Sequence, residues 1–251
     1  MRHIQRSILF FIAALFFGQF AFAGLDEAKE NYAKIFEVPV SSKFENSPFN
    51  HTYLLYGGDT YTLFDQELTI SGYQQNWRMR EDVKKGFVGL NFDQAEGLKT
   101  VLLQNLKTDW MVNAGYGTGG KKIVVISAPN CPPCKQMEAD MLKYSKDIPA
   151  SIFIVPTLLG RDQASYRNAV MCSQNPNASW QRSWQSSAYP KSSTQCEKSR
   201  WAEIVIDNAF PVVNGQAHIG TPAIILPDGR VIKGWKAGGS VADLKRKLGL
   251  L

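Results

Sequence analysis

The sequence predicts a mixed α and β protein in two parts, a small β-rich N-terminal unit and a larger C-terminal α/β unit. The first indication is a series of short segments within residues 52–73 that are rich in β-branched and aromatic residues, as strands are. The second is the continuous apolar run at residues 121–127, which suits a buried parallel strand. The third is the strong turn signal at residues 227–230, which separates two further apolar segments.

The first 23 residues have the three parts of a secretory signal peptide. Arg2 and Arg6 give a basic start, residues 8–17 are apolar, and Ala21-Phe22-Ala23 matches the small-residue pattern that precedes a cleavage site. The apolar run is shorter than the roughly 20 residues that a membrane span requires. We therefore expect cleavage after Ala23, export, and a mature protein without stable membrane insertion.

The charge and the cysteines narrow the function classes further. The full chain has a formal net charge of +6, but its lysines and arginines are scattered among acids instead of forming a stripe, which argues against a nucleic-acid partner. The chain contains 4 cysteines, and in an exported protein these indicate disulfides sooner than a metal site. Of the possible pairings, the spacing favours Cys131 with Cys134 and Cys172 with Cys196.

The N-terminal unit is expected to cover residues 24–90. Residues 25–38 have apolar side chains at helical spacing, and residues 52–56, 60–64 and 67–73 predict a small antiparallel meander. A core built from about 60 residues is thin, so pairing with a second copy of the chain would help to stabilise it.

A linker helix and a hinge are expected over residues 91–120. Residues 92–112 predict a helix, and Asn91 or Asp93 could cap its start. The glycine-rich residues 115–120 predict a flexible turn after this helix.

The C-terminal unit is expected to cover residues 121–251. Residues 121–127 and 151–157 predict buried strands on either side of a helix over residues 135–147, which makes a βαβ unit. The remaining expected elements are helical stretches within residues 162–184, a helix over residues 199–209, a hairpin of residues 223–226 and 231–235, and a closing helix over residues 241–248. A βαβ half, inserted helices, an antiparallel hairpin and a last helix follow the order of a thioredoxin-like fold with a helical insertion.

Cys131 and Cys134 form the motif Cys-Pro-Pro-Cys between the first of these strands and its helix. Thiolate is the attacking species in thiol–disulfide exchange, and unpaired N–H groups at a helix start favour the anion at Cys131. Cys134, one turn later, can attack a mixed disulfide and release the enzyme. Pro132 suits the first helical turn and Pro133 removes a second N–H donor, so both are expected to tune the reactivity of the pair.

Three other interpretations of this motif compete. A plain structural disulfide is unexpected between a strand and a helix. A zinc site would require Cys172 and Cys196 to converge on the motif, and their spacing is not that of four-cysteine zinc sites. A haem attachment site requires a histidine after the second cysteine, where Lys135 stands. We therefore expect neither a metal nor a cofactor.

Two further features accompany the motif. Thr221 and Pro222 lie about ninety residues later, just before a strand, where a thioredoxin-like fold places a cis-proline that exposes backbone groups to a bound peptide. Cys172 and Cys196 enclose a polar, tryptophan-bearing stretch. We expect them to form a structural disulfide that contributes roughly 3 kcal/mol to stability. A second catalytic pair is the lesser alternative.

These parts together resemble the periplasmic disulfide isomerases of the DsbC/DsbG type. The resemblance is carried by KKIVVISAPNCPPCKQM at residues 121–137, by the second cysteine pair, and by GTPAIILPDGRVIKGW at residues 220–235. It implies a periplasmic homodimer in which residues 24–90 form a cystatin-like α+β dimerisation domain and two active sites face an apolar cleft.

The resemblance also implies roles for individual residues. Cys131 would attack, Cys134 would resolve, and Thr221 and Pro222 would contact the substrate. A membrane thiol reductant of the DsbD type would keep the cysteines reduced. The sequence departs from this family at Pro133, where tyrosine is usual.

The leading hypothesis is therefore a disulfide isomerase or reductase that acts on misfolded or wrongly disulfide-bonded exported proteins. A dedicated thiol reductase of one partner, or of sulfenylated cysteines, is the alternative within the same chemistry. Residues 24–90 favour the isomerase, because a monomeric thioredoxin would not need them. A chaperone-type binding protein is the alternative from another class, because tryptophans could line a cleft; the candidates are Trp77, Trp180, Trp184 and Trp235.

Overall fold

The structure, a computed structural model, describes two compact units that divide between Leu106 and Lys107. The described residues are 25–36, 44–57, 60–65, 70–73, 76–80, 87–186, 188–210, 212–213, 216–217, 220–236 and 238–251. The expected signal peptide at residues 1–23 lies outside these ranges, and so does the side chain of Trp77. No helix within the described ranges has the length and apolar character needed to cross a bilayer.

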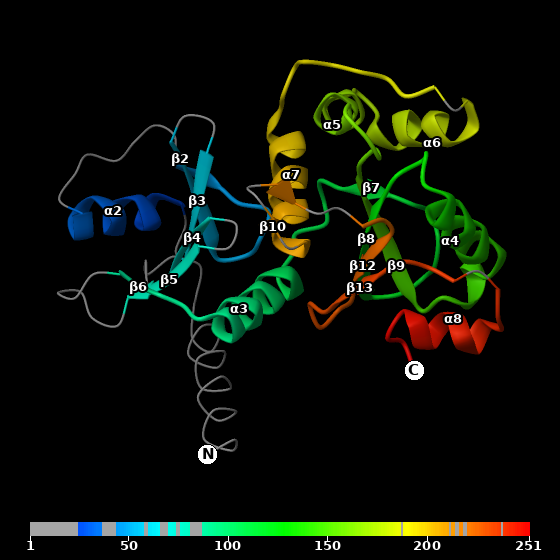
Figure 1. The fold of residues 1–251 in the computed structure, drawn as a ribbon, viewed down its shortest axis with the longest axis horizontal. Coiled ribbons are helices and arrows are strands. Elements are labelled where there is room, and N and C mark those ends of the chain that lie inside the picture. Colours follow the sequence, from blue (N-terminus) through cyan, green and yellow to red (C-terminus); the bar gives the residue numbers. More distant parts are fainter. Residues whose placement is uncertain are drawn as a thin grey trace. The chain divides into compact units, whose positions relative to one another are not determined.

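The described part of the first unit consists of two helices and an antiparallel sheet (Figure 1). Its elements are α2 (Leu25–Phe36), β1 (Phe44–Asn46), β2 (Thr52–Gly57), β3 (Thr60–Asp65), β4 (Ile70–Tyr73), β5 (Asn76–Arg80), β6 (Phe87–Gly89) and α3 (Phe92–Gln104). The strands follow one another in sheet order as they do in sequence. The predicted meander corresponds to β2, β3 and β4, whereas β1, β5 and β6 are strands that the sequence analysis missed.

One part of the core of this unit is an aromatic cluster between α2 and the sheet. Ala28 of the helix is buried with Phe44, Tyr53 and Phe64 of the strands. Tyr32 packs its ring against two of them, 5.5 Å from Phe44 and 5.8 Å from Phe64 between centroids. The amphipathic pattern of residues 25–38 therefore correctly predicts a helix that buries one face.

Helix α3 (Phe92–Gln104) is shorter than predicted. Asn91 caps its start, because its side chain accepts from Gln94 N and its backbone N–H donates to the Gln94 side chain. At the other end, the Asn105 side chain donates to the Val101 carbonyl, and Leu106 forms a β-bridge with Phe49. The prediction of a helix through residue 112 is therefore wrong for its last two turns, where the backbone leaves the helix to form other hydrogen bonds.

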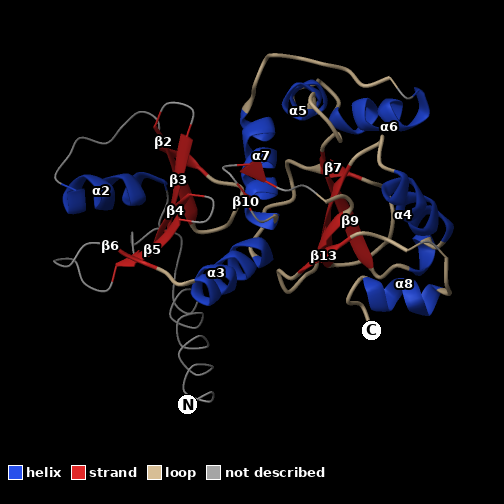
Figure 2. Cartoon of the chain, viewed as in Figure 1, coloured by secondary structure: helices blue, strands red, loops and turns tan. Residues whose placement is uncertain are grey.

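The second unit is built on a five-stranded sheet with helices on both sides (Figures 1 and 2). Its strands are β7 (Val112–Asn113), β8 (Lys121–Ser127), β9 (Ala150–Pro156), β12 (Ala223–Ile225) and β13 (Val231–Lys233) in the order β13-β12-β8-β9-β7, and a separate pair is β10 (Val212–Val213) with β11 (Gln216–Ala217). Strands β8 and β9 are parallel, and the other pairings of the five-stranded sheet are antiparallel.

The helices of this unit complete the predicted order. They are α4 (Pro132–Lys143), the 3₁₀ turn η1 (Ser145–Asp147), α5 (Gln163–Met171), α6 (Pro176–Ser186), α7 (Glu197–Ala209) and α8 (Val241–Lys247). Helices α4 and α8 lie on one side of the sheet and α7 lies on the other (Figure 1). Since α5, α6 and α7 all fall between β9 and β12, the thioredoxin-like order with a helical insertion is confirmed.

The glycine-rich residues 115–120 are packed against the start of β9. Thr118 N donates to the Ile148 carbonyl at 3.0 Å. Gly117 has a φ of +74°, and a Cβ at this position would overlap the carbonyl oxygen of Ala150. Residues 115–120, predicted as a flexible turn, are therefore a close-fitting loop that needs glycine for both its backbone conformation and its lack of a side chain.

Candidate active site

Cys131 is the N-cap residue of α4. Its backbone N–H donates to the Ala128 carbonyl at 3.1 Å, which closes the turn after β8. Pro132 and Pro133 occupy the first helical positions and carry no N–H, so the first available helical donor is that of Cys134. This N–H lies 3.3 Å from Cys131 Sγ and donates to it. The two prolines thus leave a single backbone donor of the first turn aimed at the sulfur.

The two sulfurs of the motif lie in direct contact. The Cys134 thiol donates to Cys131 Sγ across 2.7 Å, and the two side chains are 0% and 1% exposed, respectively. Burial raises the pKa of Cys134, and the hydrogen bond to Cys131 acts in the same direction. The pair is therefore asymmetric, because Cys131 Sγ accepts hydrogen bonds from both the N–H and the thiol of Cys134 at the helix start.

The loop before β12 forms another side of this site. The Thr221–Pro222 peptide bond is cis, and the Thr221 carbonyl accepts a hydrogen bond from Cys131 Sγ at 3.3 Å. Pro222 is buried, and its own carbonyl accepts from Gly234 N at 2.8 Å. Because β12 pairs directly with β8, the sheet brings together two segments that lie far apart in the sequence.

Asn130 anchors the loop that carries Cys131. Its side-chain amide donates to the Leu159 carbonyl at 2.9 Å, and its Oδ1 accepts from Leu159 N at 2.9 Å. Next to this pair, Thr157 N donates to the Ser127 carbonyl. The sequence analysis did not identify Asn130, because an asparagine after a strand is an ordinary turn residue and its partner lies on another segment.

A buried carboxyl group lies on α4, one turn after Cys134. Glu138 is 7% exposed, and burial raises the pKa of its carboxyl to about 7, although a hydrogen bond with Tyr116 lowers it. Its Oε1 has no hydrogen-bond partner in the described part of the chain. Burial also raises the pKa of Tyr116, and the negative charge of Glu138 raises it further. Glu138 is the second residue that the sequence analysis missed, because an isolated glutamate in a helix normally faces solvent.

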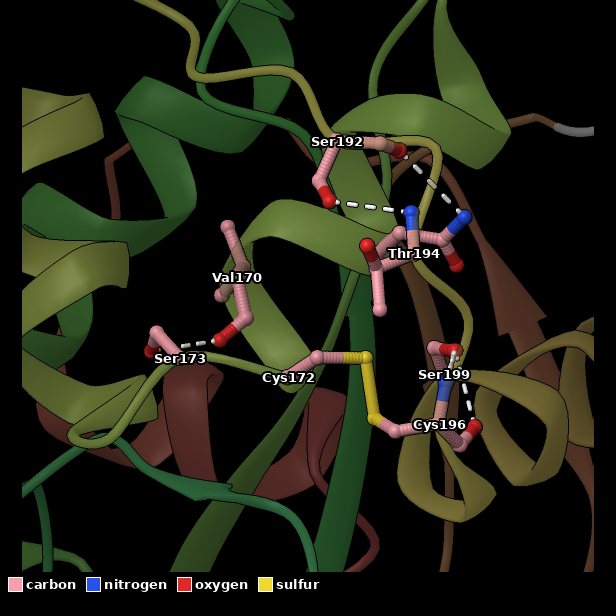
Figure 3. The surroundings of a disulfide bond; sticks show 8 residues. Val170, Cys172, Ser173, Ser192, Thr194, Cys196 and Ser199 are labelled. Atoms are coloured by element: carbon pink, nitrogen blue, oxygen red, sulfur yellow. Dashed lines mark hydrogen bonds between the residues drawn. A yellow bond between two sulfur atoms is a disulfide. The ribbon is translucent and has the colours of Figure 1, made fainter.

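Cys172 and Cys196 form a disulfide between the end of α5 and the start of α7 (Figure 3). Their Cα atoms are 5.7 Å apart, and the bond closes a segment with a sequence separation of 24 residues. Ser199 secures the α7 end, because its hydroxyl accepts from Cys196 N. The bond closes a loop that contains all of α6, and neither cysteine belongs to the cluster around Cys131 and Cys134. Among the described residues, no three histidine, cysteine or acidic side chains gather in a way that could hold a metal ion.

The tryptophans suggested as cleft residues lie in different places. Trp184 of α6 packs against the buried cluster formed by Ala128, Cys131 and Cys134. Trp180, one turn earlier, is 3% exposed and contacts Trp184 edge-to-face. Trp235 instead donates from Nε1 to Asp140 of α4 at 2.9 Å. Of these three described side chains, Trp184 is therefore the one that packs against the cysteine cluster.

A Cys-x-x-Cys pair at the start of a helix, with a cis-proline loop against its first sulfur, defines the site of a thiol:disulfide oxidoreductase. Residues 112–248 match the family described as Thioredoxin-like domain, and this match covers more than half of the 251 residues. The chain therefore belongs to the thioredoxin-like domain family.

The chain is also similar to individual proteins. The chain is 24% identical over 212 residues to a protein of Bordetella pertussis named "Probable thiol:disulfide interchange protein DsbC", covering 83% of this chain and 70% of that protein. Among solved structures, a disulfide interchange protein from Neisseria gonorrhoeae is 21% identical with a TM-score of 0.43, covering 57% of this chain and 98% of its own. Helicobacter pylori DsbG is 11% identical with a TM-score of 0.25, covering 89% and 90%.

Proposed function

We propose that this chain is a periplasmic disulfide isomerase and reductase that acts on misfolded exported proteins. The observation that carries this proposal is the position of Cys131 Sγ, which accepts from Cys134 N at the start of α4 and contacts the Thr221 carbonyl beside the cis-proline. The similarity to a DsbC protein over most of the chain supports it. Residues 1–23 would direct export, and the first unit would serve as a dimerisation domain.

The proposed reaction begins with attack by Cys131. Its thiolate forms a bond with one sulfur of a substrate disulfide, and the other substrate sulfur leaves with the electron pair as a thiolate. The backbone of Thr221 and the ring of Pro222 would hold the substrate chain beside the new mixed disulfide. No electrons enter or leave the complex in this step.

The mixed disulfide can then react in two ways. In isomerisation, a different substrate thiolate attacks the substrate sulfur bonded to Cys131, so that a new substrate disulfide forms and Cys131 leaves as a thiolate. In reduction, Cys134 loses its proton and attacks Cys131, which gives the Cys131–Cys134 disulfide and a substrate dithiol. A thiol reductant must then return two electrons, and a membrane donor of the DsbD type is the proposed source.

The environment of Cys134 favours isomerisation over reduction. Burial raises the pKa of this thiol, so its thiolate forms rarely near neutral pH and the mixed disulfide has time to rearrange. The burial of Cys131 supports the dedicated reductase as a second candidate, because a nucleophile that is 1% exposed admits fewer substrates.

Two substitutions test the proposed roles on a scrambled, disulfide-bonded substrate. Cys131→Ala is expected to reduce recovery of substrate activity to the uncatalysed rate. Cys134→Ala is expected to accumulate a mixed disulfide and to lose insulin reduction while it keeps isomerisation within about tenfold of the unaltered enzyme. Catalysis by Cys131 is excluded if recovery survives Cys131→Ala. Loss of both activities in Cys134→Ala would favour the reductase.

A further inference from the structure

Trp184 is a residue of the helical insertion that packs on the redox cysteines. It belongs to α6, some fifty residues after Cys131 in the sequence, and contacts the buried cluster of Ala128, Cys131 and Cys134. Cys131 is 1% exposed, although the proposed reaction requires its sulfur to approach a disulfide in another protein. Trp184 is therefore one of the side chains that surround the buried redox cysteines.

Trp184 is held in place from within its own helix. Its ring contacts Trp180 edge-to-face, with centroids 5.5 Å apart and planes at 77°. Trp180 and Ser183 are both buried, so the face of α6 just before Trp184 is anchored in the core. At the start of α6, the Asn177 side chain accepts from Asn113 N of β7 at 3.1 Å. The indole is thus fixed by the packing of a whole helix.

The Cys172–Cys196 disulfide encloses this helix. It joins the end of α5 to the start of α7 (Figure 3), and α6 lies between the two cysteines in the sequence. Opening the bond would increase the freedom of the segment that carries Trp184, because its two ends would no longer be fixed to each other. The Cys172–Cys196 disulfide and the Cys131–Cys134 pair are therefore connected through Trp184.

The indole N–H of Trp184 is a second feature that bears on its role. Nε1 of Trp184 is buried and has no hydrogen-bond partner among the residues that the structure describes. A buried donor without an acceptor costs roughly 1–3 kcal/mol, and a ligand that supplies an acceptor recovers part of this cost. An extended polypeptide presents backbone carbonyls at regular spacing, whereas carbonyls within helices and sheets are already paired.

We propose that Trp184 is a substrate-selecting residue that shields Cys131 and admits disulfides in extended, locally unfolded segments. The segment would displace the indole from the sulfur and offer a backbone carbonyl to Nε1. The Cys172–Cys196 disulfide holds Trp184 in the shielding position. This inference rests on the proposed role of Cys131 as the attacking thiol, and it adds the class of substrate.

The test measures access to Cys131 in the full mature chain with Cys134→Ala, so that Cys131 is the single free thiol. Alkylation rates are compared for N-ethylmaleimide and for the same maleimide attached to a long polyethylene glycol chain. Trp184→Ala is expected to raise the ratio of the large-probe rate to the small-probe rate by about tenfold, and Trp184→Phe by less. An unchanged ratio in Trp184→Ala overturns the proposal.

Trp201→Ala is the matched control. Trp201 lies in the same insertion on α7, pairs edge-to-face with Trp110, and also has a buried Nε1 without a described partner. It does not belong to the cysteine cluster. Its substitution should leave the ratio within about twofold of that of the Cys134→Ala protein. An equal rise in both variants would indicate general loosening and would overturn the assignment to Trp184.

Two further readouts separate the parts of the proposal. The double substitution Cys172→Ser and Cys196→Ser should raise the ratio of large-probe to small-probe alkylation rates toward that of Trp184→Ala. Added to Trp184→Ala, the same double substitution should raise the ratio little further. No rise would refute the positioning role of the disulfide. Indole fluorescence should change when Cys131 and Cys134 are oxidised to a disulfide in the otherwise unaltered chain and in Trp201→Phe. It should not change in Trp184→Phe. An undiminished change in Trp184→Phe would overturn the contact of Trp184 with the cysteine cluster. These measurements read access and contact, whereas the Cys131→Ala assay above decides the role of the thiol.

Discussion

At the scale of single residues, Glu138 makes the stability of the second unit depend on pH. Its carboxyl has an ordinary pKa of 4.5 in the unfolded chain and a pKa raised by burial to about 7 in the folded one. Between these values the folded protein binds a proton that the unfolded chain has released. Stability is therefore greatest below pH 4.5 for this group and falls as the pH rises through 7.

Glu138→Gln removes this dependence, because glutamine keeps the shape of the side chain and carries no charge. We expect the free energy of unfolding of the unaltered protein to fall relative to that of Glu138→Gln by about 3 kcal/mol between pH 4.5 and pH 8. Urea unfolding across this range measures the difference. Glu197→Gln, which changes an exposed glutamate of α7, is the control. Parallel pH profiles for the unaltered protein and Glu138→Gln would contradict the prediction.

At the scale of elements, substitutions in the loop of residues 115–120 before β8 measure how much its close packing contributes to stability. Gly115 and Gly117 have almost equal φ angles of +73° and +74°, but only a Cβ at Gly117 would collide with the Ala150 backbone. Gly117→Ala should lower the free energy of unfolding by about 3 kcal/mol, from left-handed strain and overlap together. Gly115→Ala carries the strain alone and should cost about 1 kcal/mol. Equal losses in chemical denaturation would mean that the overlap has no cost.

Sequence patterns predicted the elements that carry the chemistry better than those that support it. The apolar runs of β8 and β9 and the cap-and-proline start of α4 are local signals, so they identified the strand–motif–helix unit correctly. The packing of Trp184 against the cluster of Ala128, Cys131 and Cys134 depends on where α6 lies in the folded unit, and nothing local to either segment encodes it. Strand β7 was missed for a similar reason, because its two residues pair with β9 only once the sheet exists.

At the scale of the whole molecule, the first unit predicts the oligomeric state. Its sheet is an open series with β1 and β6 at its edges. If it is the proposed dimerisation domain, the mature chain should have about twice the mass of one chain in solution, as a symmetric dimer. Size-exclusion chromatography with light scattering measures this. A monomeric mass at micromolar concentration would remove the main reason to prefer the isomerase over the dedicated reductase.

The hydrogen bonds of the Asp140 carboxylate bear on how α4 behaves during the proposed reaction. It lies on α4 and accepts hydrogen bonds from Trp235 Nε1 at 2.9 Å and from Gly238 N at 3.1 Å, both on the segment that follows the cis-proline strand pair. Helix α4 is thus attached to the β12–β13 hairpin region at two points, by its N-cap Cys131 to Thr221 just before β12 and by Asp140 to the segment after β13. In the proposed reaction, bonding of Cys131 Sγ to a substrate would release Thr221, whereas the attachment through Asp140 would remain and would keep α4 in place. Capture and release of a substrate would then use one unchanged geometry.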